Sequence, residues 1–475
     1  MIRHPFLDKL RNKIISKNDS LASKRINWIK RNNYYYSQVI SSMKFIIEEN
    51  ANILHIRCST GYILNSLKPK YGLGIDDSDM MIREAKKKFP GINFICSDLE
   101  LIKTDKKFDY IIISSVEDIV DLKSVLDNLR DCCTNFTRII IINYNYLWHP
   151  IVKFTEFLKL KIPQKLHNWF SAGDLENILL LCGFEKTNRK RIILFPYNIP
   201  IISYLINRFI ARLPVFRSFT FIHISIARII TDAIQPPSVS VVIPCRNEAG
   251  NIEDAVKRIP EMGSHTEIIF CDDKSTDGTV HKIQEAIKSY PDKDIKLVYG
   301  PGICKSENVW TGFDSASGDI LMILDADLTV IPEELPYFYE AISKNRGEFI
   351  NGSRLVYPMH DEAMRFLNML GNKFFSMFFS YILDTPIKDT LCGTKVLWKR
   401  DYHRIRKLRG SWGIMDRWGD YELIFGAIKC NLKFLELPVH YYERTYGITK
   451  MTGRIRNGWI MLKMSFNALF KIKFY

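Results

Sequence analysis

Short apolar runs alternate with longer amphipathic stretches along this chain, in two separate series. The first series contains the runs ANILHI, YGLGID, INFICSD, FDYIIISS and RIIIINY, between residues 51 and 144. Amphipathic stretches such as MIREAKKKF and LKSVLDNLRDCC lie between these runs. Buried strands that alternate with helices are typical of βαβ units, so the pattern predicts an α/β domain with a mostly parallel sheet.

The second series runs from residue 239 to residue 328 and contains VSVVIP, TEIIFCDD, IKLVYG and DILMILDADL. Each run ends in acidic or turn residues, and ligands of open α/β sheets bind beyond the carboxyl ends of the strands. The QPP at 235–237 marks a boundary between the two series. We therefore expect the following parts: a helical N-terminal extension (1–50), a first Rossmann-like α/β domain (51–195), a basic apolar connector (196–236) and a second α/β domain with an amphipathic C-terminal tail (237–475).

The charge balance favours an anionic partner. The 475 residues carry 67 Lys and Arg against 52 Asp and Glu, which gives a net charge of +15. Nucleotide phosphates, an acidic membrane surface and nucleic acid all match that excess. Neither zinc-finger spacing nor an RNP-type aromatic motif is present, so we do not expect a nucleic-acid partner.

Several features bear on where the protein works. Its ten cysteines lack CxxC spacing, and the charged N-terminus lacks the apolar core of a secretory signal, so we expect reduced thiols in the cytoplasm. Two segments, RFIARLPVFRSFTFIHISIARII and the tail RIRNGWIMLKMSFNALFKIKFY, interleave basic with bulky apolar residues. Both patterns fit packed helices with basic outer faces, and both also fit peripheral contact with the anionic inner face of a membrane.

Two carboxylates follow the last strand of the second series. Asp325 and Asp327 are separated by one residue where the run DILMIL ends. At that position both side chains can reach one hard cation, and Mg²⁺ or Mn²⁺ takes oxygen ligands while sharing substrate phosphates. The pair therefore indicates a metal site that neutralises charge on a diphosphate leaving group.

The motifs around this pair resemble family 2 glycosyltransferases of the GT-A fold, in particular the dolichol-phosphate-mannose-synthase-like branch. VVIPCRNEAGNI, CDDKSTDGT, SGDILMILDADL, GSR, DTLCGTKVLWKR and ERTYGITK follow one another in that family's order. The resemblance covers nearly all of residues 239–450. It implies a metal-dependent, inverting transfer of sugar from a nucleotide-sugar donor to a glycan hydroxyl or a polyprenyl phosphate.

Site residues come from the same resemblance. It assigns Asp325 and Asp327 to the metal, with Asp325 also facing the donor. Lys305 stands in a phosphate-binding turn that here reads ICKSE. Both Arg354 and Arg444 are expected to contact a phosphate or to form a surface salt bridge. Around the nucleotide it places Pro244, Arg246, Glu248 and Asp273.

RWGDYELIFGA supplies the acidic residues Asp420 and Glu422. Many members of the family have a general base here that acts on an acceptor hydroxyl, and we expect Asp420 to fill this role rather than Glu422. The alternatives for Asp420 are helix capping and support of the metal site. A polyprenyl phosphate is already ionised and needs no base, so the acceptor stays open between a hydroxyl and a lipid phosphate.

Residues 51–185 resemble class I S-adenosylmethionine (SAM)-dependent methyltransferases. Motifs ILHIRCSTGYILNSL, YGLGIDDSDMMIREAKKKFP, FICSDLE and NWFSAGDLENILLLCGFE carry the resemblance. It implies SAM contacts by His55, Gly61, Asp76 and Asp98. The glycine-rich motif departs from the family pattern, because Arg57 and Ser59 replace glycines that let the backbone approach the cofactor.

The sequence thus predicts a glycosyltransferase with an N-terminal domain that either methylates with SAM or serves as a degenerate partner-binding domain. Two alternatives remain for the whole protein. A nucleotidyltransferase would carry a glycine-rich basic loop after the first strand, where this chain has CRNEAGNI. A nucleotide-binding scaffold would need neither half to be catalytic.

Overall fold

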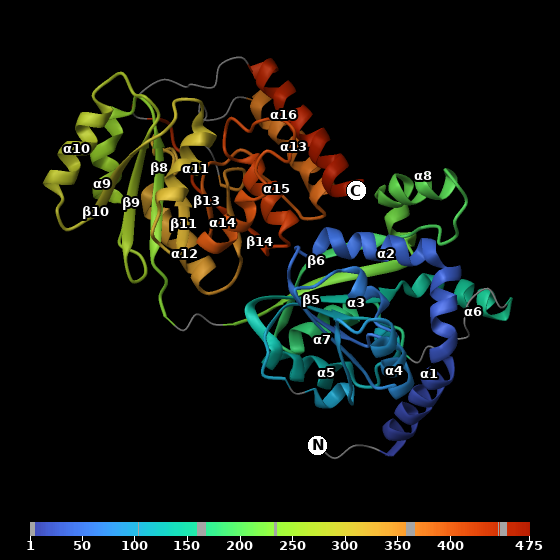
Figure 1. The fold of residues 1–475 in the computed structure, drawn as a ribbon. Helices are drawn as coiled ribbons and strands as arrows, with labels where there is room; N and C mark the ends of the chain where they lie inside the picture. The colour runs from blue at the N-terminus through green and yellow to red at the C-terminus, as the bar shows by residue number, and fades with distance from the viewer. Residues whose placement is uncertain are drawn as a thin grey trace. The chain divides into compact units, whose positions relative to one another are not determined.

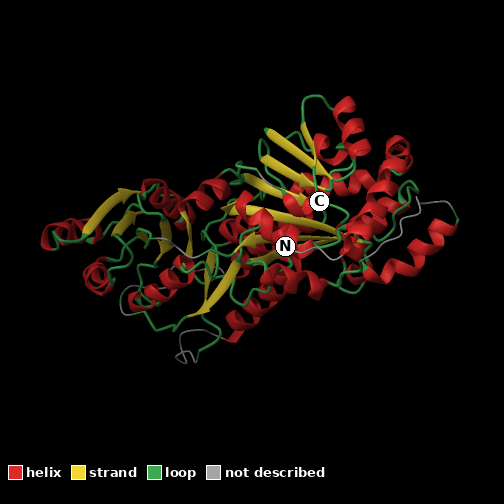
Figure 2. Ribbon diagram, turned by 90° about the horizontal axis from the view of Figure 1, so that it is seen from below, coloured by secondary structure: helices red, strands yellow, loops and turns green. Residues whose placement is uncertain are grey.

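The computed structural model describes residues 5–102, 104–158, 168–231, 235–357, 366–444, 446 and 454–475, and the side chains from 370 and 456 onward in the last two helices. The chain forms two compact units, Met1–Thr231 and Asp232–Tyr475. Each unit has a seven-stranded sheet with helices packed on it (Figures 1 and 2). The prediction of two α/β domains is confirmed.

The N-terminal unit begins with two helices and continues with strands and helices in alternation. Its elements are α1 (Pro5–Arg31), α2 (Asn33–Ile46), β1 (Asn52–Ile56), α3 (Tyr62–Ser66), β2 (Tyr71–Asp76), α4 (Asp79–Lys88), β3 (Asn93–Cys96), β4 (Phe108–Ile113), α5 (Leu122–Leu129), β5 (Cys133–Tyr144), α6 (His149–Phe157), α7 (Ala172–Leu181), β6 (Phe184–Ile192), α8 (Ile202–Arg208) and β7 (Ile222–Ile229).

The strand order of this sheet is β3-β2-β1-β4-β5-β7-β6. The first five strands are parallel, whereas β7 runs antiparallel between β5 and β6. Alternate residues of each central strand enter different apolar clusters: Leu54 and Ile56 belong to one, Ile53 to the other. This period of two buries both faces of the sheet, as a parallel sheet covered by helices requires.

The expected connector, residues 196–236, is corrected by the structure. It contains β7, which lies inside the N-terminal sheet. Arginines made this segment look like a surface element, but Arg228 is fully buried and its Nε donates to Glu185 on β6 at 2.8 Å. A cross-strand carboxylate neutralises the guanidinium, so a strand that carries an arginine can occupy the sheet interior.

The C-terminal unit follows the same alternation at first and then becomes mostly helical. Its elements are β8 (Val239–Cys245), α9 (Ile252–Arg258), β9 (Thr266–Asp272), α10 (Thr279–Ser289), β10 (Asp294–Tyr299), α11 (Lys305–Ser315), β11 (Ile320–Ile323), α12 (Leu335–Ser343), β12 (Phe349–Ser353), α13 (Phe366–Leu383), β13 (Lys395–Trp398), α14 (Lys399–Arg406), α15 (Tyr421–Lys429), β14 (Phe434–Pro438) and α16 (Arg454–Ala468).

Strand order in the second sheet is β10-β9-β8-β11-β13-β12-β14. β10, β9, β8 and β11 are parallel, so their carboxyl ends lie along one edge. β13 runs antiparallel to both of its neighbours. The acidic residues that end β9 and follow β11 therefore meet at the same edge of the sheet.

The sequence predicts an amphipathic C-terminal tail, and the structure describes this tail from residue 454. The tail is helical, and α16 packs Met461, Met464 and Ala468 into the core while also presenting exposed apolar side chains. No helix among the described residues is long and apolar enough to cross a membrane. All ten cysteines are free thiols.

The fit of α11 against β8 and β9 provides a test of the C-terminal core. A Cβ at Gly312 would lie 2.4 Å from Val242 Cγ1 and 2.5 Å from Cys271 Sγ. We expect Gly312→Val to destabilise the unit by about 1–3 kcal/mol through overpacking, seen as a lower midpoint of thermal unfolding. Gly458→Val is the matched control, because nothing lies within 4 Å of a Cβ there. Equal midpoints for the two variants would contradict this packing.

Candidate active site

The carboxyl edge of the C-terminal sheet gathers several acidic side chains. Asp272 ends β9 and Asp273 follows it. Asp325 and Asp327 follow β11, and Glu248 lies in the turn after β8. Strands β9, β8 and β11 are adjacent, which brings these turns together. Close carboxylates repel one another, so the arrangement requires cations nearby.

Asp325 is held by Lys305, the first residue of α11. Lys305 Nζ lies 2.5 Å from Asp325 Oδ1. Burial raises the pKa of Asp325, but Lys305, then Lys395 and Arg354, outweigh burial and lower it. In the same way, Asp325, Asp420 and Asp327 raise the pKa of Lys305 against the effect of its burial. Both groups are therefore charged at neutral pH.

A glycine makes room for this carboxylate. A Cβ at Gly393, just before β13, would lie 2.1 Å from Asp325 Oδ2. The sequence motif DTLCGTK contains this glycine, but the motif alone gave no reason to assign it to the site. Only the packing of the β13 turn against β11 shows that Gly393 is needed for close approach.

Asp327 is held by a second cation, Arg444. Arg444 Nη2 lies 2.5 Å from Asp327 Oδ2, and Arg444 Nη1 lies 3.7 Å from Glu248 Oε1. The other oxygen of Asp327 accepts a hydrogen bond from Thr329 Oγ1 at 2.9 Å. Each carboxylate of the Asp pair thus has its own cationic partner, and Arg444 also links the pair to the turn after β8.

The turns after β8 and β9 form a polar corner. Pro244 lies near the end of β8, and Arg246 Nη1 lies 3.8 Å from Asp273 Oδ2. Asp272 and Asp273 each have a buried Oδ1 with no hydrogen-bond partner among the described residues. Such acceptors call for donors from a ligand, and the amino groups of a base or the hydroxyls of a ribose have the right character. Asp273 was predicted from the sequence to lie at the nucleotide, whereas Asp272 was not.

The Asp pair fits a hard divalent cation. Its oxygen atoms suit Mg²⁺ or Mn²⁺, and Mg²⁺ is commonly bound by one or two carboxylates plus substrate phosphates. Within the described part of the chain, no group of three His, Cys, Asp or Glu side chains is arranged to hold a metal. A cation here would be held by Asp325 and Asp327 and would take its other ligands from the donor diphosphate or water.

Asp420 stands at the N-cap of α15, not on a strand. Its Oδ1 lies 2.6 Å from Lys395 Nζ, and both residues are buried. The side-chain cap of α15 comes instead from Asp416, whose Oδ2 accepts from the backbone N–H of Tyr421 at 2.8 Å and of Glu422 at 3.1 Å. Asp420 is therefore paired with a buried lysine. The capping of α15, which was one alternative role for Asp420, is performed by Asp416.

Arg354 forms a buried ion pair rather than a surface salt bridge. Its Nε and Nη2 donate to the two oxygens of Asp389 at 2.7 and 2.9 Å, and Asp389 is fully buried. The pKa of Asp389 falls well below its usual range, because Arg354 and nearby hydrogen bonds outweigh the effect of burial. The bidentate pair fixes the turn after β12 beside Asp325, whose pKa it also lowers.

In the N-terminal unit, the loop after β1 keeps the backbone shape of a glycine-rich turn without its glycines. Arg57, Ser59 and Gly61 have φ of 61°, 52° and 72°. Positive φ costs non-glycine residues of order 1–3 kcal/mol, so the surrounding packing enforces this conformation. Gly61 itself is required by packing, because a Cβ there would lie 2.5 Å from the Phe94 ring.

The side chains that the resemblance assigns to SAM are engaged within the protein. Asp76 is 2 % exposed, and its two oxygens accept from the backbone N–H of Ser59 at 2.8 Å and of Ser78 at 3.0 Å. His55 Nε2 hydrogen-bonds Ser114 Oγ at 2.8 Å, and burial lowers the pKa of His55 to about 3. Neither residue presents the free carboxylate that the cofactor hydroxyls or amine would need.

Helix α1 covers the strand ends beside Asp98. Asp98 accepts from the backbone N–H of Glu100 at 2.9 Å and lies 3.8 Å from Arg11 Nη1 of α1. Farther along α1, Asp19 Oδ1 accepts from Ser78 Oγ at 2.5 Å. The residues present do not fit SAM in the way that the resemblance assigns, and we derive no chemistry through that cofactor.

Each unit contains a match to the model of a known family. The model for glycosyl transferase family 2 matches residues 240–426, and the model for a methyltransferase domain matches residues 53–135. The dolichol-phosphate mannosyltransferase of Pyrococcus furiosus is 42 % identical over 120 residues, which are 25 % of this chain and 33 % of that protein. The undecaprenyl-phosphate 4-deoxy-4-formamido-L-arabinose transferase of Edwardsiella ictaluri is 33 % identical over 107 residues, 22 % of this chain and 33 % of that protein. The chain thus spans about a third of the length of these curated relatives.

Solved structures resemble one unit or the other. A SAM-dependent methyltransferase from Thermotoga maritima, described as a possible histamine N-methyltransferase, is 15 % identical with a TM-score of 0.35, covering 46 % of this chain and 99 % of that one. A mannosyltransferase from Pyrobaculum calidifontis in complex with GDP-Man and Mn²⁺ is 19 % identical with a TM-score of 0.35, covering 49 % of this chain and 64 % of that one.

The contact between Gly393 and Asp325 provides a test of the metal site. We expect Gly393→Ala to weaken Mn²⁺-dependent binding of a nucleoside diphosphate at least tenfold, because the added methyl group displaces the Asp325 carboxylate. Isothermal titration of GDP and UDP with and without Mn²⁺ measures this. Gly371→Ala, where nothing lies within 4 Å of a Cβ, is the matched control and should bind as the unmodified protein does. Unchanged metal dependence in Gly393→Ala would remove Asp325 from the metal site.

Proposed function

Since the C-terminal unit contains a family 2 glycosyltransferase domain and the N-terminal unit a methyltransferase domain, we propose that the protein transfers a sugar from a nucleotide-sugar donor to a lipid phosphate at a membrane surface. The donor nucleotide binds at the turns after β8 and β9, through Pro244, Arg246, Glu248 and Asp273 together with Asp272. Its diphosphate lies toward Asp325 and Asp327.

The ion pair between Asp420 and Lys395 is the observation that favours a phosphate acceptor over a hydroxyl acceptor. A hydroxyl acceptor needs a base within hydrogen-bond reach to remove its proton, and Asp420 was expected to be that base. One oxygen of Asp420 accepts a hydrogen bond from the buried ammonium of Lys395 at 2.6 Å, so that oxygen is already engaged and is not available to take a proton from an acceptor hydroxyl. A phosphate acceptor is already ionised and needs no proton removed. In this proposal Asp420 therefore positions Lys395 instead of acting as a base.

The reaction is a single in-line displacement. A phosphate oxygen of the acceptor forms a bond to the anomeric carbon, the bond from that carbon to the donor diphosphate breaks, and the configuration at the carbon inverts. Lys305 and Arg444, which pair with the two metal-site carboxylates, bring positive charge to the leaving diphosphate. A divalent cation bound at the Asp pair would supply further neutralisation of that leaving group.

The relatives support a lipid phosphate acceptor. Both curated relatives are named for transfer to a polyprenyl phosphate, dolichol phosphate in one and undecaprenyl phosphate in the other. They are named for different sugars, mannose and 4-deoxy-4-formamido-L-arabinose. The proposal therefore specifies the class of acceptor and leaves the donor sugar unassigned.

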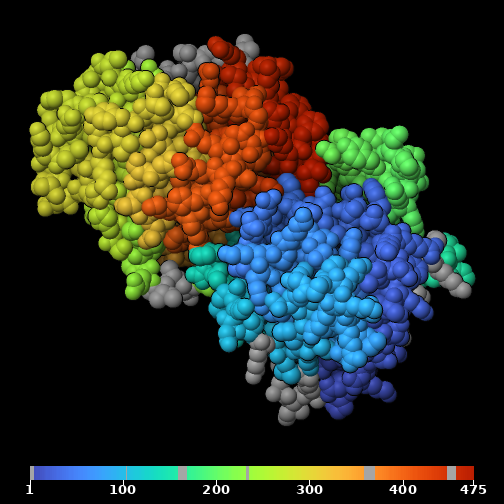
Figure 3. All heavy atoms as spheres, viewed as in Figure 1, coloured from blue at the N-terminus to red at the C-terminus, as the bar shows by residue number. Residues whose placement is uncertain are grey.

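Helices α13 and α16 supply a surface for a membrane. The two helices touch through Phe378 and Phe466, whose ring centroids lie 5.6 Å apart. The last helix lies on the surface of its unit, drawn red in Figure 3. Exposed lysines accompany the exposed apolar side chains, which is the composition that binds an anionic bilayer surface. The exposed residues are Leu370, Lys373, Phe374, Met377, Trp459, Lys463, Phe466, Phe470 and Lys471.

For the N-terminal unit we propose no methyl transfer. Asp76 and Asp98, assigned to the cofactor by the resemblance, are held by backbone N–H groups, and Arg11 of α1 lies beside Asp98. These contacts all lie within the N-terminal unit and are independent of the proposed sugar transfer.

The choice of acceptor is tested with a matched pair of compounds. We expect sugar transfer to citronellyl phosphate and none to citronellol, with labelled GDP-mannose and a panel of UDP-sugars as donors. Product formation is followed by partition of label into the organic phase. Transfer to the alcohol or to simple glycosides, with the phosphate inert, would refute a lipid phosphate acceptor.

The variant Asp420→Asn tests separately whether Asp420 acts as a general base. The amide oxygen still accepts from Lys395, so we expect the rate to fall less than about tenfold, whereas loss of a general base costs about 10²- to 10⁴-fold. Removal of a charge beside a buried lysine also lowers stability, so the assay temperature is set below the unfolding midpoint of the variant. A loss of more than 10²-fold in the folded variant would restore Asp420 as the base.

Membrane contact is tested by flotation with vesicles. We expect the protein to float with vesicles that contain anionic phosphatidylglycerol and to stay behind with pure phosphatidylcholine. Trp459→Ser with Phe470→Ser should reduce the floating fraction severalfold, because Trp459 and Phe470 are 58 % and 51 % exposed on α16 and the turn after it. Tyr337→Ser on α12, 65 % exposed, is the control for loss of an exposed aromatic ring. Equal flotation of all three proteins would exclude this surface.

A further inference from the structure

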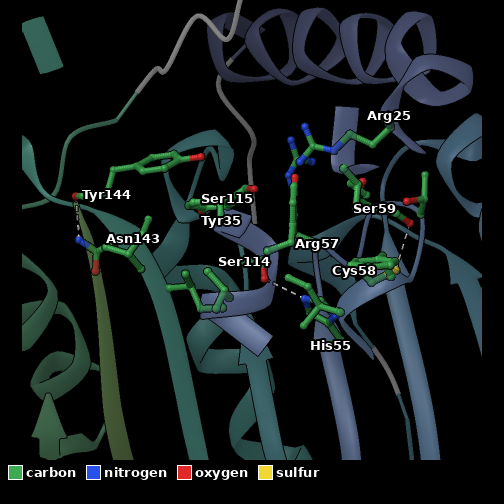
Figure 4. Close-up of a pocket in the computed structure, with 18 of the residues that line it drawn as sticks. Arg25, Tyr35, His55, Arg57, Cys58, Ser59, Ser114, Ser115, Asn143 and Tyr144 are labelled. Atoms are coloured by element: carbon green, nitrogen blue, oxygen red, sulfur yellow. Dashed lines mark hydrogen bonds between the residues drawn. The ribbon is translucent and has the colours of Figure 1, made fainter. Parts of the chain in front are cut away.

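The N-terminal unit contains a pocket above the carboxyl ends of β1, β4 and β5 that neither proposal above uses. Its empty volume is about 670 Å³ when the space open to solvent is included, and it lies between these strand ends and helices α1 and α2. Figure 4 shows His55, Arg57 and Ser114 rising from the sheet and Arg25 reaching in from the helical side. Tyr35, Tyr36 and Tyr144 form its aromatic wall.

Polar atoms without partners are concentrated in this pocket. Five side chains that line it each have a buried nitrogen or oxygen with no hydrogen-bond partner in the described part of the chain. Buried polar groups are nearly always paired, so a cluster of this size indicates a ligand. Four of the five residues are less than 5 % exposed. The atoms are Arg25 Nε, His55 Nδ1, Arg57 Nη2, Thr60 Oγ1 and Asn143 Oδ1.

The two arginines indicate that the ligand carries a negative charge. Arg25 and Arg57 extend their guanidinium groups toward the same part of the pocket (Figure 4). Like charges in a buried place repel each other unless an anion lies between them. Arg57 Nη1 pairs with Asp77, which leaves Nη2 available. No carboxylate among the described residues lies within ion-pair distance of Arg25, and in that part of the chain neither Arg25 Nε nor Arg57 Nη2 has a hydrogen-bond partner.

The nearby carboxylates do not fill this role. Asp76 accepts hydrogen bonds from two backbone N–H groups, and Asp77 pairs with Arg57 Nη1. Glu117 Oε1 accepts from the backbone N–H of Tyr144 at 2.6 Å. Asp118 acts on Arg25 and Arg57 through its charge without an ion pair. The acids around the pocket are engaged elsewhere, while the cationic donors still point inward.

We propose that this pocket binds a small molecule through an acidic group, a carboxylate or a phosphate, placed between Arg25 and Arg57. Arginine presents planar donor edges that match the oxygens of either group. Thr60 supplies a hydroxyl donor, and neutral His55 supplies its free ring nitrogen. The body of the ligand lies against the tyrosine wall. The loop that would serve a methyl donor in the fold family serves an anion here, because Arg57 replaces a glycine.

The experiment compares three aromatic probes on the full chain by isothermal titration. These are phenyl phosphate, benzoate and the uncharged benzamide. We expect at least one of the two anions to bind saturably, with benzamide at least tenfold weaker. Arg25→Gln and Arg57→Gln should each raise the dissociation constant of that anion at least tenfold. The anion that binds more tightly tells a phosphate ligand from a carboxylate ligand.

Matched variants separate this pocket from other sites and from misfolding. Arg83→Gln is the control for loss of an arginine, since that side chain is 70 % exposed on α4. Lys305→Gln removes a cation from the C-terminal site and should leave probe binding unchanged. Arg25 lies on a helix and outside the strained loop, so Arg25→Gln tests the proposal even if Arg57→Gln does not fold.

Three outcomes would overturn the proposal: no binding of either anion, binding that is lost in Lys305→Gln, or binding that survives both pocket variants. Displacement of the probe by SAM would also overturn it, because the pocket would then be a cofactor site. Failure of sugar transfer has no bearing on this result, since the readout is binding of a probe in the N-terminal unit.

Discussion

Pairing of carboxylates with individual cations is the interaction on which the C-terminal site depends. Asp325 and Asp327 follow β11, and Asp420 stands at the start of α15; all three act on Lys305 through their charges, and unpaired carboxylates this close would repel one another. Lys305, Arg444 and Lys395 each take one of these charges. Because the cations come from α11, from the segment after β14 and from β13, the site forms only when the whole unit has folded.

This pairing also organises the proposed chemistry. In the proposed reaction Lys305 and Arg444 lie beside the donor diphosphate, and a divalent cation at the Asp pair would compensate the carboxylates from which they turn away. The oxygens of Asp272 and Asp273 that lack partners lie at the other end of the same edge. The two ends of this edge therefore suit different parts of the proposed donor. The ion pairs after β11 suit the diphosphate, and the acceptors after β9 that lack partners suit the nucleoside.

At the corresponding sheet edge of the N-terminal unit, the carboxylates have partners, whereas some arginine nitrogens have none among the described residues. Its acidic residues are satisfied by backbone N–H groups or by Arg57, and it is the arginine donors that lack partners. Two α/β sheets in one chain thus present edges of different chemical character. The fold provides a place for a ligand, and the side chains at the strand ends decide which ligand that is.

Much of the fold follows from the sequence pattern. The apolar runs that predicted strands became β1 to β5 and β8 to β11, because short apolar runs between helical stretches are typical of strands in a parallel sheet covered by helices. The Asp pair and its position after β11 were also determined by sequence, since one-residue spacing at a strand end is a local property. Less regular strands were missed: β7 carries a buried arginine whose partner, Glu185, lies on another strand.

Contacts between distant segments were decided only by the tertiary structure. Nothing in the chain order of Gly393 and Asp325, or of Lys395 and Asp420, shows that they touch, because each pair is joined by packing between separate elements. For the same reason, the motif that resembles a SAM loop did not reveal that both oxygens of Asp76 accept hydrogen bonds from backbone N–H groups. Nor did it reveal that Arg25 of α1 and Arg57 line the same pocket. Sequence determined which chemical groups follow which strands, and the packing of helices over the strand ends decided which of those groups remain free to bind.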